Sequence, residues 1–129
     1  MSALNVRFRI DFPGHTSVGP GKICLLEAIR DAGSLSQAAR NIGMSYRRAW
    51  LLAESLNQSF RSPVTLGSAG GKHGGGMQVT ELGIALIEQY RALEQEFQTL
   101  ATRRFRVVTP TIVQHPKSHL RTSIRSKVL

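Results

Sequence analysis

The chain has 129 residues, about the length of one ordinary domain, and its 17 lysines and arginines outnumber its 8 aspartates and glutamates to give a net charge of +9. This length excludes two full-sized domains, and no apolar stretch approaches the roughly 20 residues that cross a bilayer. Because the start of the chain also lacks the pattern of a secretory signal peptide, we expect a cytoplasmic protein with no membrane partner.

The first predicted element is a strand over residues 4–12, where apolar and polar side chains alternate without a break. Pro13 and Gly14 end this strand, and the following residues up to Gly21 are predicted as a turn-rich segment. One face of the strand should therefore be buried. The side chains expected to point toward the core are Leu4, Val6, Phe8, Ile10 and Phe12.

A first helix is predicted over residues 22–32, where Ile23, Leu26 and Ile29 recur at helical spacing and Gly33 follows as a stop signal. Cys24, the only cysteine, lies among apolar neighbours and is expected to be buried. A single cysteine cannot form an intrachain disulfide, which favours a reducing compartment.

Two further helices are predicted close together. A short one covers residues 35–42, and a longer one opens after an N-capping serine, Ser45, and reaches Leu56 or Phe60. They are separated by little more than Gly43, and helices joined by so tight a turn must cross steeply. The pair has the pattern of a helix-turn-helix, with small or apolar residues at the motif's offsets. These residues are Ala39, Gly43, Met44, Ala49 and Leu52.

The exposed start of the second helix of this pair has the chemistry expected at a DNA major groove. Arg47 and Arg48 suit guanine O6 and N7, and Ser45 with the helix N-terminus suits a phosphate. Tyr46 suits a thymine methyl group or the backbone, whereas Trp50 is predicted to lie in the core. The same small residues also occur in helix pairs that never touch DNA, and an arginine pair is often only a solvated face. The predicted DNA-binding residues are Ser36, Gln37, Ser45, Tyr46, Arg47 and Arg48, with Lys72 and His73 in the next loop.

A β-hairpin is predicted next, with strands at residues 64–66 and 77–79 and a loop over residues 67–76 that holds six glycines. Its place after the helix pair is that of the wing of a winged helix, with Lys72 and His73 at the tip, over the neighbouring groove or backbone. The alternative is a flexible linker. A nucleotide-binding loop is disfavoured because no Ser or Thr follows Lys72.

A long helix is predicted from Thr80 to about Arg104, and its apolar residues repeat at close to heptad spacing. This stripe predicts a dimer seam made of Leu82, Leu86, Tyr90, Leu93, Phe97 and Leu100. No acidic residue follows Glu96, so +7 of the +9 charge lies beyond it. Residues 105–129 are therefore predicted to be a basic, flexible tail without a fold.

Together these elements predict a mostly α-helical fold with a small β component: a winged helix-turn-helix with a β-hairpin wing and a long C-terminal dimerisation helix. The predicted organisation is a DNA-binding domain over residues 1–79, a dimerisation helix over residues 80–104 and a basic tail over residues 105–129. No nucleophile lies beside a candidate base, so no enzyme is predicted. His15, His73, His115 and His119 are dispersed, and no metal site is expected.

The chain resembles the N-terminal DNA-binding domain of the ModE family, bacterial molybdate-responsive transcription regulators whose domain is distantly similar to that of LysR-type regulators. The resemblance covers roughly residues 4–100. It is carried by the glycine-rich loop before Thr80-Glu81-Leu82-Gly83 and by the runs Gly19-Pro20-Gly21-Lys22, Leu25-Leu26-Glu27-Ala28-Ile29, Gly33-Ser34-Leu35-Ser36-Gln37-Ala38-Ala39 and Met44-Ser45-Tyr46-Arg47-Arg48-Ala49-Trp50. It implies a winged helix that binds a palindromic operator in double-stranded DNA as a homodimer.

ModE regulators continue into two small β-barrel domains that bind molybdate, whereas this chain ends at Leu129 with a basic stretch. We therefore expect a ModE-like regulator without that domain and with no cofactor. Molybdate is a ligand by resemblance only, and the small-molecule effector stays open. Two alternatives remain: a regulator that senses molybdate or another oxyanion at a non-standard site, and a helix-turn-helix module that binds protein. DNA binding requires the basic residues to share one face.

Overall fold

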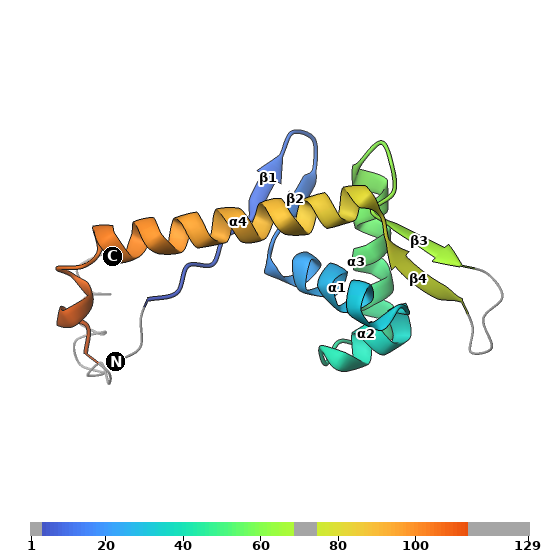
Figure 1. The fold of residues 1–129 in the computed structure, drawn as a ribbon, viewed down its shortest axis with the longest axis horizontal. Coiled ribbons are helices and arrows are strands. Elements are labelled where there is room, and N and C mark those ends of the chain that lie inside the picture. The colour runs from blue at the N-terminus through green and yellow to red at the C-terminus, as the bar shows by residue number, and fades with distance from the viewer. Residues whose placement is uncertain (1–3, 69–74, 114–129) are drawn as a thin grey trace, which may run out of the picture.

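The computed structural model describes residues 4–68 and 75–113, and this part of the chain folds into four α-helices, two β-hairpins and a short 3₁₀ helix (Figure 1). Each hairpin is a separate two-stranded antiparallel sheet. The predicted fold class, a winged helix-turn-helix with a hairpin wing and a long C-terminal helix, is confirmed. None of the described helices is long and apolar enough to cross a membrane.

The N-terminal segment forms less strand than predicted. Only Ile10–Phe12 is paired, as β1, and it pairs with β2, Thr16–Val18, through a turn in which Gly14 has a φ of 78°. Strand β2 was missed because turn formers surround it. Phe12, predicted to face the core, is 38% exposed.

Residues 4–9 are extended but follow helix α4 (Glu81–Arg104) instead of pairing with a strand. The Val6 amide donates to Gln98 Oε1 over 3.0 Å, and the Gln98 side-chain amide donates to the Leu4 carbonyl. The alternation of half-buried and exposed residues is as predicted. The half-buried side of this segment thus packs against helix α4. The Gln98 side chain of that helix supplies hydrogen bonds to the backbone of the segment.

Helix α1 (Pro20–Ala32) begins with a proline in its first turn, where no backbone donor is lost, and ends at Gly33 in the left-handed conformation. Its buried residues include Ile23, Leu26 and Ile29, as predicted. Cys24 was wrongly predicted to be buried: it is exposed, because the buried stripe of the helix passes on either side of it.

Helices α2 (Leu35–Asn41) and α3 (Tyr46–Ser59) meet at a turn in which Gly43 has a φ of 67°. A residue with a Cβ is strained in this conformation. The Met44 amide donates to the Ala39 carbonyl over 2.9 Å and closes the turn. Ser45 accepts from the Arg48 amide over 3.2 Å, which confirms the predicted N-cap.

The second hairpin pairs β3 (Thr65–Ser68) with β4 (Gly76–Val79) and projects from the helical body (Figure 1). Its predicted loop tip, with Lys72 and His73, lies outside the described residues. The base of the hairpin is tied to α4, since the Thr80 amide donates to the Val64 carbonyl over 2.9 Å.

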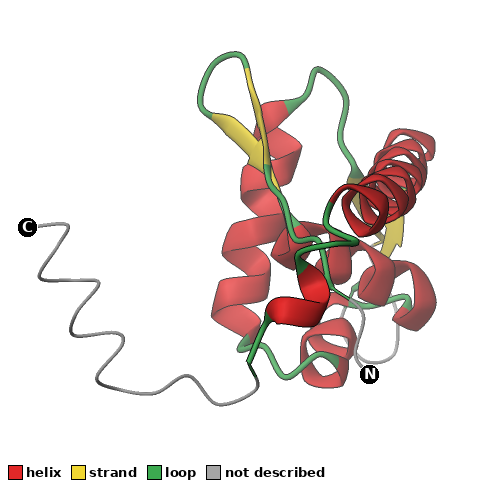
Figure 2. Ribbon diagram, turned by 90° about the vertical axis from the view of Figure 1, so that its left-hand side faces the viewer, coloured by secondary structure: helices red, strands yellow, loops and turns green. Residues whose placement is uncertain are grey.

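Helix α4 follows from the N-cap Thr80 and extends well beyond the helical body (Figure 1). Figure 2 looks almost along α4 while α3 is seen from the side, so the two helices cross steeply. The segment after α4 was predicted to have no fold, but residues Thr109–Thr111 form the short 3₁₀ helix η1. The rest of the predicted basic tail, from residue 114, lies outside the described residues.

Two groups of buried side chains make the core. One joins the three short helices and uses small residues where α2 and α3 cross, among them Ala39, Ala49 and Ala53. The other lies beneath α4 and joins Val18, Ile23, Leu26, Leu56, Val64, Ile87 and Tyr90. Trp50 belongs to neither group: it is 46% exposed, so its prediction as a core residue was wrong.

Candidate nucleic-acid interface

The start of α3 is an exposed, positively charged helix end. Ser45 accepts the Arg48 amide and leaves Tyr46, Arg47 and Arg48 on the surface. A helix N-terminus carries partial positive charge from its unpaired amides, and the two guanidinium groups add to it. This end of α3 therefore suits an anionic partner that offers hydrogen-bond acceptors.

Helix α2 places a second set of polar side chains on the surface, including the predicted residues Ser36 and Gln37. The side-chain Nε2 of Gln37 donates to Asn41 Oδ1 over 2.7 Å, and Arg40 Nη2 donates to Gln37 Oε1 over 2.8 Å. The prediction did not include Arg40. Its spacing of three residues from Gln37 on a helix was a usable signal, because side chains at that spacing are neighbours.

Asn57 fixes the wing against α3. Its Oδ1 accepts from the amides of Val64 and Thr65 over 2.8 and 3.1 Å, and its Nδ2 donates to Thr65 Oγ1 over 2.9 Å. Thr65 is only 3% exposed, so these bonds satisfy polar groups that water cannot easily reach. This positioning residue was missed: an asparagine within a helix hints at a backbone role but does not identify its partners.

The arginines of the helix pair differ in their partners from three other arginines of the described chain. In the part of the chain that the structure describes, ion pairs join Arg9 to Asp11, Arg30 to Asp31, and Arg91 to both Glu27 and Glu94. Within that same part, no carboxylate pairs with the arginines of α2 and α3, which are Arg40, Arg47 and Arg48. Their charge is available to an outside partner.

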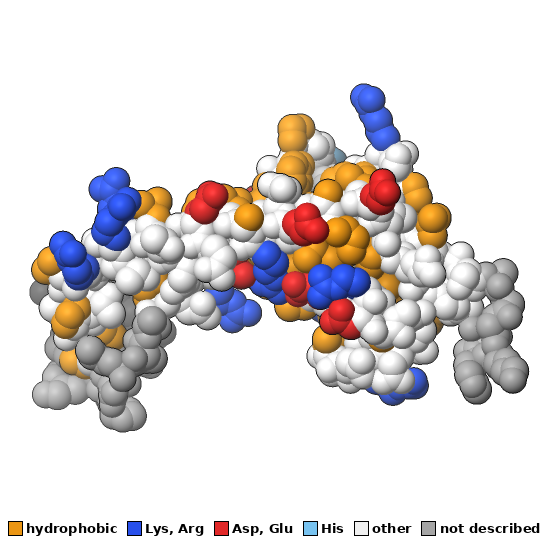
Figure 3. Space-filling model, in the orientation of Figure 1, with side chains coloured by type: hydrophobic (Ala, Val, Ile, Leu, Met, Phe, Trp, Pro, Cys, Tyr) orange, Lys and Arg blue, Asp and Glu red, His pale blue; other side chains and the backbone are white. Residues whose placement is uncertain are grey.

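Figure 3 shows a contrasting face of the molecule. Acidic and basic side chains lie next to one another across its middle, over α1 and α4, and basic side chains gather at the C-terminal end of α4. An ion pair between Glu27 and Arg91 joins α1 to α4. Among the described residues, positive charge without a carboxylate partner is therefore found at the end of α4 as well as on α2 and α3.

The predicted dimer seam on α4 is exposed at its ends and covered in its middle. Leu82 and Leu100 are exposed, whereas Tyr90 is only 2% exposed. Tyr90 stacks on Phe8 with ring centroids 4.5 Å apart and donates its hydroxyl to the Phe8 carbonyl over 2.7 Å. Phe97 meets the edge of the same ring at 4.9 Å. The N-terminal segment thus occupies part of the stripe that the sequence predicted for a second chain.

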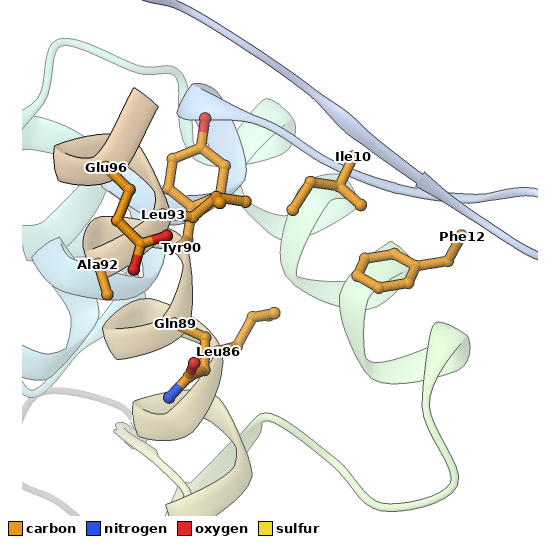
Figure 4. A pocket seen from close by; sticks show the side chains of 8 residues that line it. All are labelled: Ile10, Phe12, Leu86, Gln89, Tyr90, Ala92, Leu93 and Glu96. Carbon is orange, nitrogen blue, oxygen red and sulfur yellow. The ribbon is translucent and has the colours of Figure 1, made fainter. Parts of the chain in front are cut away.

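Burial raises the pKa of Tyr90, and the nearby Glu94 carboxylate raises it further. Beside Tyr90 lies an apolar groove of about 250 Å³ between β1 and α4. In Figure 4 the side chains of Ile10 and Phe12 face Leu86 and Leu93 across it. Two leucines of the dimer seam therefore line a groove whose opposite wall is a strand of the same chain.

A clamp of ion pairs holds α4 on α1. Arg91 donates to both oxygens of Glu27, from Nε over 2.9 Å and from Nη2 over 2.6 Å, and to Glu94 Oε1 over 2.8 Å. These hydrogen bonds, led by those to Glu27, hold the pKa of Arg91 above its usual value against the effect of burial. A bidentate arginine–carboxylate pair fixes the direction of the contact as well as its distance. It therefore orients α4 relative to α1.

Among the described residues, no group of three histidine, cysteine or acidic side chains is placed to hold a metal ion. His15 is exposed on the β1–β2 hairpin, and the other three histidines lie outside the described residues. The exposed start of α3 is the candidate nucleic-acid interface among the described residues.

Comparison with known proteins finds relatives that match part of this chain. The chain is 37% identical over 97 residues to the molybdenum transport protein ModE of Azotobacter vinelandii, a match that covers 75% of this chain and 36% of that protein. It is 43% identical over 81 residues to the molybdenum-pterin-binding protein MopA of Rhodobacter capsulatus, covering 63% and 31%. It is 40% identical over 76 residues to the DNA-binding transcriptional dual regulator ModE of Escherichia coli K12, covering 59% and 29%.

The matches lie in the N-terminal region of this chain and confirm its resemblance to ModE regulators. The chain spans about a third of the length of these curated relatives. No family model matches it. By their names, these relatives are a molybdenum transport protein, a molybdenum-pterin-binding protein and a DNA-binding transcriptional regulator.

Proposed function

We propose that this ModE-like chain is a sequence-specific DNA-binding transcription regulator that acts as a homodimer on a palindromic operator. One observation carries the proposal: the start of α3 is exposed and N-capped, and it carries arginines that no carboxylate neutralises among the described residues. The helix crosses α2 at a glycine turn and is tied to a hairpin. A steeply crossing helix pair with an exposed recognition helix, followed by a β-hairpin, is the arrangement with which winged-helix proteins bind DNA.

Each predicted DNA-binding residue has a role in the proposal. Arg47 and Arg48 contact guanine O6 and N7, and Ser45 with the α3 N-terminus lies against a phosphate. Ser36 and Gln37 contact the sugar-phosphate backbone of the DNA where α2 crosses it. Lys72 and His73 of the wing lie over the neighbouring groove. The phosphate contacts position the protein, and the base contacts give the sequence preference.

The proposed organisation follows the charge and the seam. Residues 1–79 bind DNA, residues 80–104 join two copies through the dimer seam, and the basic residues 105–129 add attraction to phosphates. In a two-fold dimer the two α3 helices enter successive major grooves on one side of the duplex. The operator half-sites should then lie about one helical turn, roughly 34 Å, apart.

The names of the relatives support a link to molybdenum and a protein without catalytic activity. In this proposal molybdate, or another oxyanion, is the candidate effector, and DNA binding is the activity that it would change. A protein-interaction module is the rival function. It predicts no sequence preference for DNA, since a basic protein binds DNA non-specifically and with a salt dependence in either case.

The test is selection of tight-binding sequences from a random double-stranded library, followed by gel shifts of the selected DNA at two salt concentrations, with and without molybdate. We expect an inverted repeat and a log–log salt slope of about −0.9 for each phosphate contacted. A library that yields no enriched sequence would contradict the proposal and favour the rival module. Sequence-specific binding that molybdate leaves unchanged would contradict the proposal that molybdate is the effector, and it would leave the proposal of a DNA-binding regulator intact.

A further inference from the structure

Helix α3 exposes large apolar side chains and buries small ones. Its inward face uses Ala49 and Ala53, whereas Tyr46, Trp50 and Leu51 are 56%, 46% and 50% exposed. A helix that only stabilised the fold would bury its largest apolar residues, because burial of a large aromatic ring contributes most to stability. Exposed apolar side chains gathered on one element indicate an interaction surface.

The exposed apolar residues share the first two turns of α3 with the arginines. Tyr46 and Trp50 are four residues apart and therefore lie one above the other on the helix, and Arg47 and Leu51 form the adjacent pair. Trp50 lies on the same side as Asn57, whose amide binds the base of the wing. Trp50 therefore lies on the side of α3 nearest the hairpin, next to the residues that we propose to contact bases.

The charge around Trp50 identifies the class of its partner. Helix α3 carries one carboxylate, Glu54, against Arg47 and Arg48, and α2 adds Arg40. In the described part of the chain none of these arginines is in an ion pair. An apolar patch within positive charge is complementary to a major groove, which presents thymine methyl groups between two phosphate backbones.

We propose that Trp50 is a specificity-determining residue that packs against a thymine methyl group next to the bases contacted by the arginines. This inference rests on the proposed function and deepens it: Trp50 selects an A·T pair, whereas arginine selects a G·C pair. The contact is van der Waals packing of the indole ring on the C5 methyl group, which only thymine presents in the major groove.

The experiment uses the selected operator and the same operator with deoxyuridine in place of thymine, one symmetric pair of positions at a time. Deoxyuridine keeps the base pairing and removes only the methyl group. We expect one pair of positions to weaken wild-type binding by about fourfold per half-site, the effect of burying one methyl group. In Trp50→Ala this penalty should vanish, because the side chain that contacts the methyl group is gone.

Three further variants make the test specific. Tyr46→Ala tests the other aromatic ring that could contact the methyl group, since Tyr46 lies one helical turn from Trp50. Val107→Ala is the matched control, because Val107 is 81% exposed beyond the end of α4 and should keep the wild-type penalty. Trp50→Phe should retain part of it. As Trp50 is the only tryptophan, the fluorescence of the wild-type protein also reports directly on its ring when operator is added.

The outcomes separate this inference from the proposed function. A wild-type protein that shows no preference for any sequence contradicts the proposed function itself. A protein that binds its operator specifically, with a methyl penalty that survives in Trp50→Ala or is lost only in Tyr46→Ala, overturns the inference and keeps the regulator. Operator binding without a penalty at any thymine also overturns it, and it leaves the exposed ring to a protein partner.

Discussion

Helices α3 and α4 both present apolar side chains to solvent, but different charges surround them. On α3 the exposed apolar residues lie among Arg47 and Arg48 with a single carboxylate, Glu54. On α4 they lie among four glutamates. Arg91 in the middle of the helix is in ion pairs with two carboxylates, and Arg103 and Arg104 come in the last turn. An apolar surface ringed by positive charge suits a polyanion, whereas the body of α4 would repel one.

The two helices also differ in how far the chain itself covers them. Trp50 is 46% exposed, whereas the middle of the α4 stripe is already covered by Phe8 of the N-terminal segment. This difference agrees with our proposal that α3 binds a separate partner. The dimer seam we propose for α4 would then use its ends, Leu82 and Leu100, and the groove beside Leu93.

Charging the α4 side should have the largest effect. Leu100→Asp places a carboxylate in the proposed dimer seam, and an unpaired buried charge should weaken the dimer by about 3–5 kcal/mol. Operator binding should fall with it. Ala85→Asp, at an exposed position of the same helix that is not part of the predicted seam, is the control. Sedimentation velocity measures the oligomeric state, and a Leu100→Asp protein that stays dimeric would exclude this seam.

The close approach of α4 to the wing gives the next largest effect. A Cβ at Gly83 would meet the Val64 carbonyl oxygen and Val79 Cγ1, both too close for a side chain. Gly83→Ala should therefore lower the free energy of unfolding by about 1–3 kcal/mol. Urea denaturation at fixed protein concentration measures this loss, and unchanged stability would show that the wing and α4 separate easily.

Gly43→Ala is the matched change before α3. A Cβ there would meet no atom within 4 Å, so only the left-handed backbone opposes it. The loss should lie near the lower end, about 1 kcal/mol. A loss larger than that of Gly83→Ala would show that the turn, and not the packing of α4, limits stability.

The α3 side is tested by its arginines. Arg47→Ala should cost about 1–3 kcal/mol of operator binding if the side chain contacts a guanine, and less on random DNA. Arg61→Ala, an exposed arginine beyond the other end of α3, should change operator binding little. Fluorescence anisotropy on operator and random DNA measures both. Equal losses on the two DNAs for Arg47→Ala would reduce its role to a phosphate contact.

The clamp between α1 and α4 should have a smaller effect. Glu27→Gln removes the carboxylate that accepts two hydrogen bonds from Arg91, and the side chains are 25% and 36% exposed. Solvent screens the pair, so we expect a loss of about 1 kcal/mol in unfolding free energy. The exposed Arg30–Asp31 pair supplies the control, since Asp31→Asn should lie within about 0.5 kcal/mol of wild type.

Tyr90 provides the smallest and most local test. Its raised folded pKa means that the unfolded state ionises first, near the ordinary value of 10.0. Its contribution to stability is therefore complete below that pH and is lost as the pH rises through the folded pKa. Tyr90→Phe should remove this dependence. Denaturation at pH 8 to 11 measures it, and identical pH profiles for the two proteins would show that burial and Glu94 do not raise the pKa of Tyr90 in the folded protein.

The helices and their ends were predictable because the signals are local. The glycine at position 43, the serine caps and the 3.6-residue spacing each act within a few residues, and all were correct. Strand β2 was missed because its pairing partner, β1, lies across a turn rich in loop formers. Strand pairing depends on a second segment, and a local pattern cannot identify that segment.

The candidate DNA interface was predicted in part. The capped start of α3 followed from Ser45 and the residues after it, but Trp50 was assigned to the core, where aromatic rings usually lie. The structure fills that core with Ala49 and Ala53 and turns Trp50 outward. Asn57 was missed as well, because its partners, Val64 and Thr65, are brought to it only by the fold.

The sequence by itself determined which segments become helix and where each begins, because propensity, capping and periodicity depend on neighbouring residues. The tertiary structure decided which side of each helix faces solvent. It placed Phe8 over Tyr90, paired Arg91 with Glu27 and left the arginines of α3 without a carboxylate in the described chain. Burial and ion pairing are contacts between distant residues, so they depend on how the helices pack.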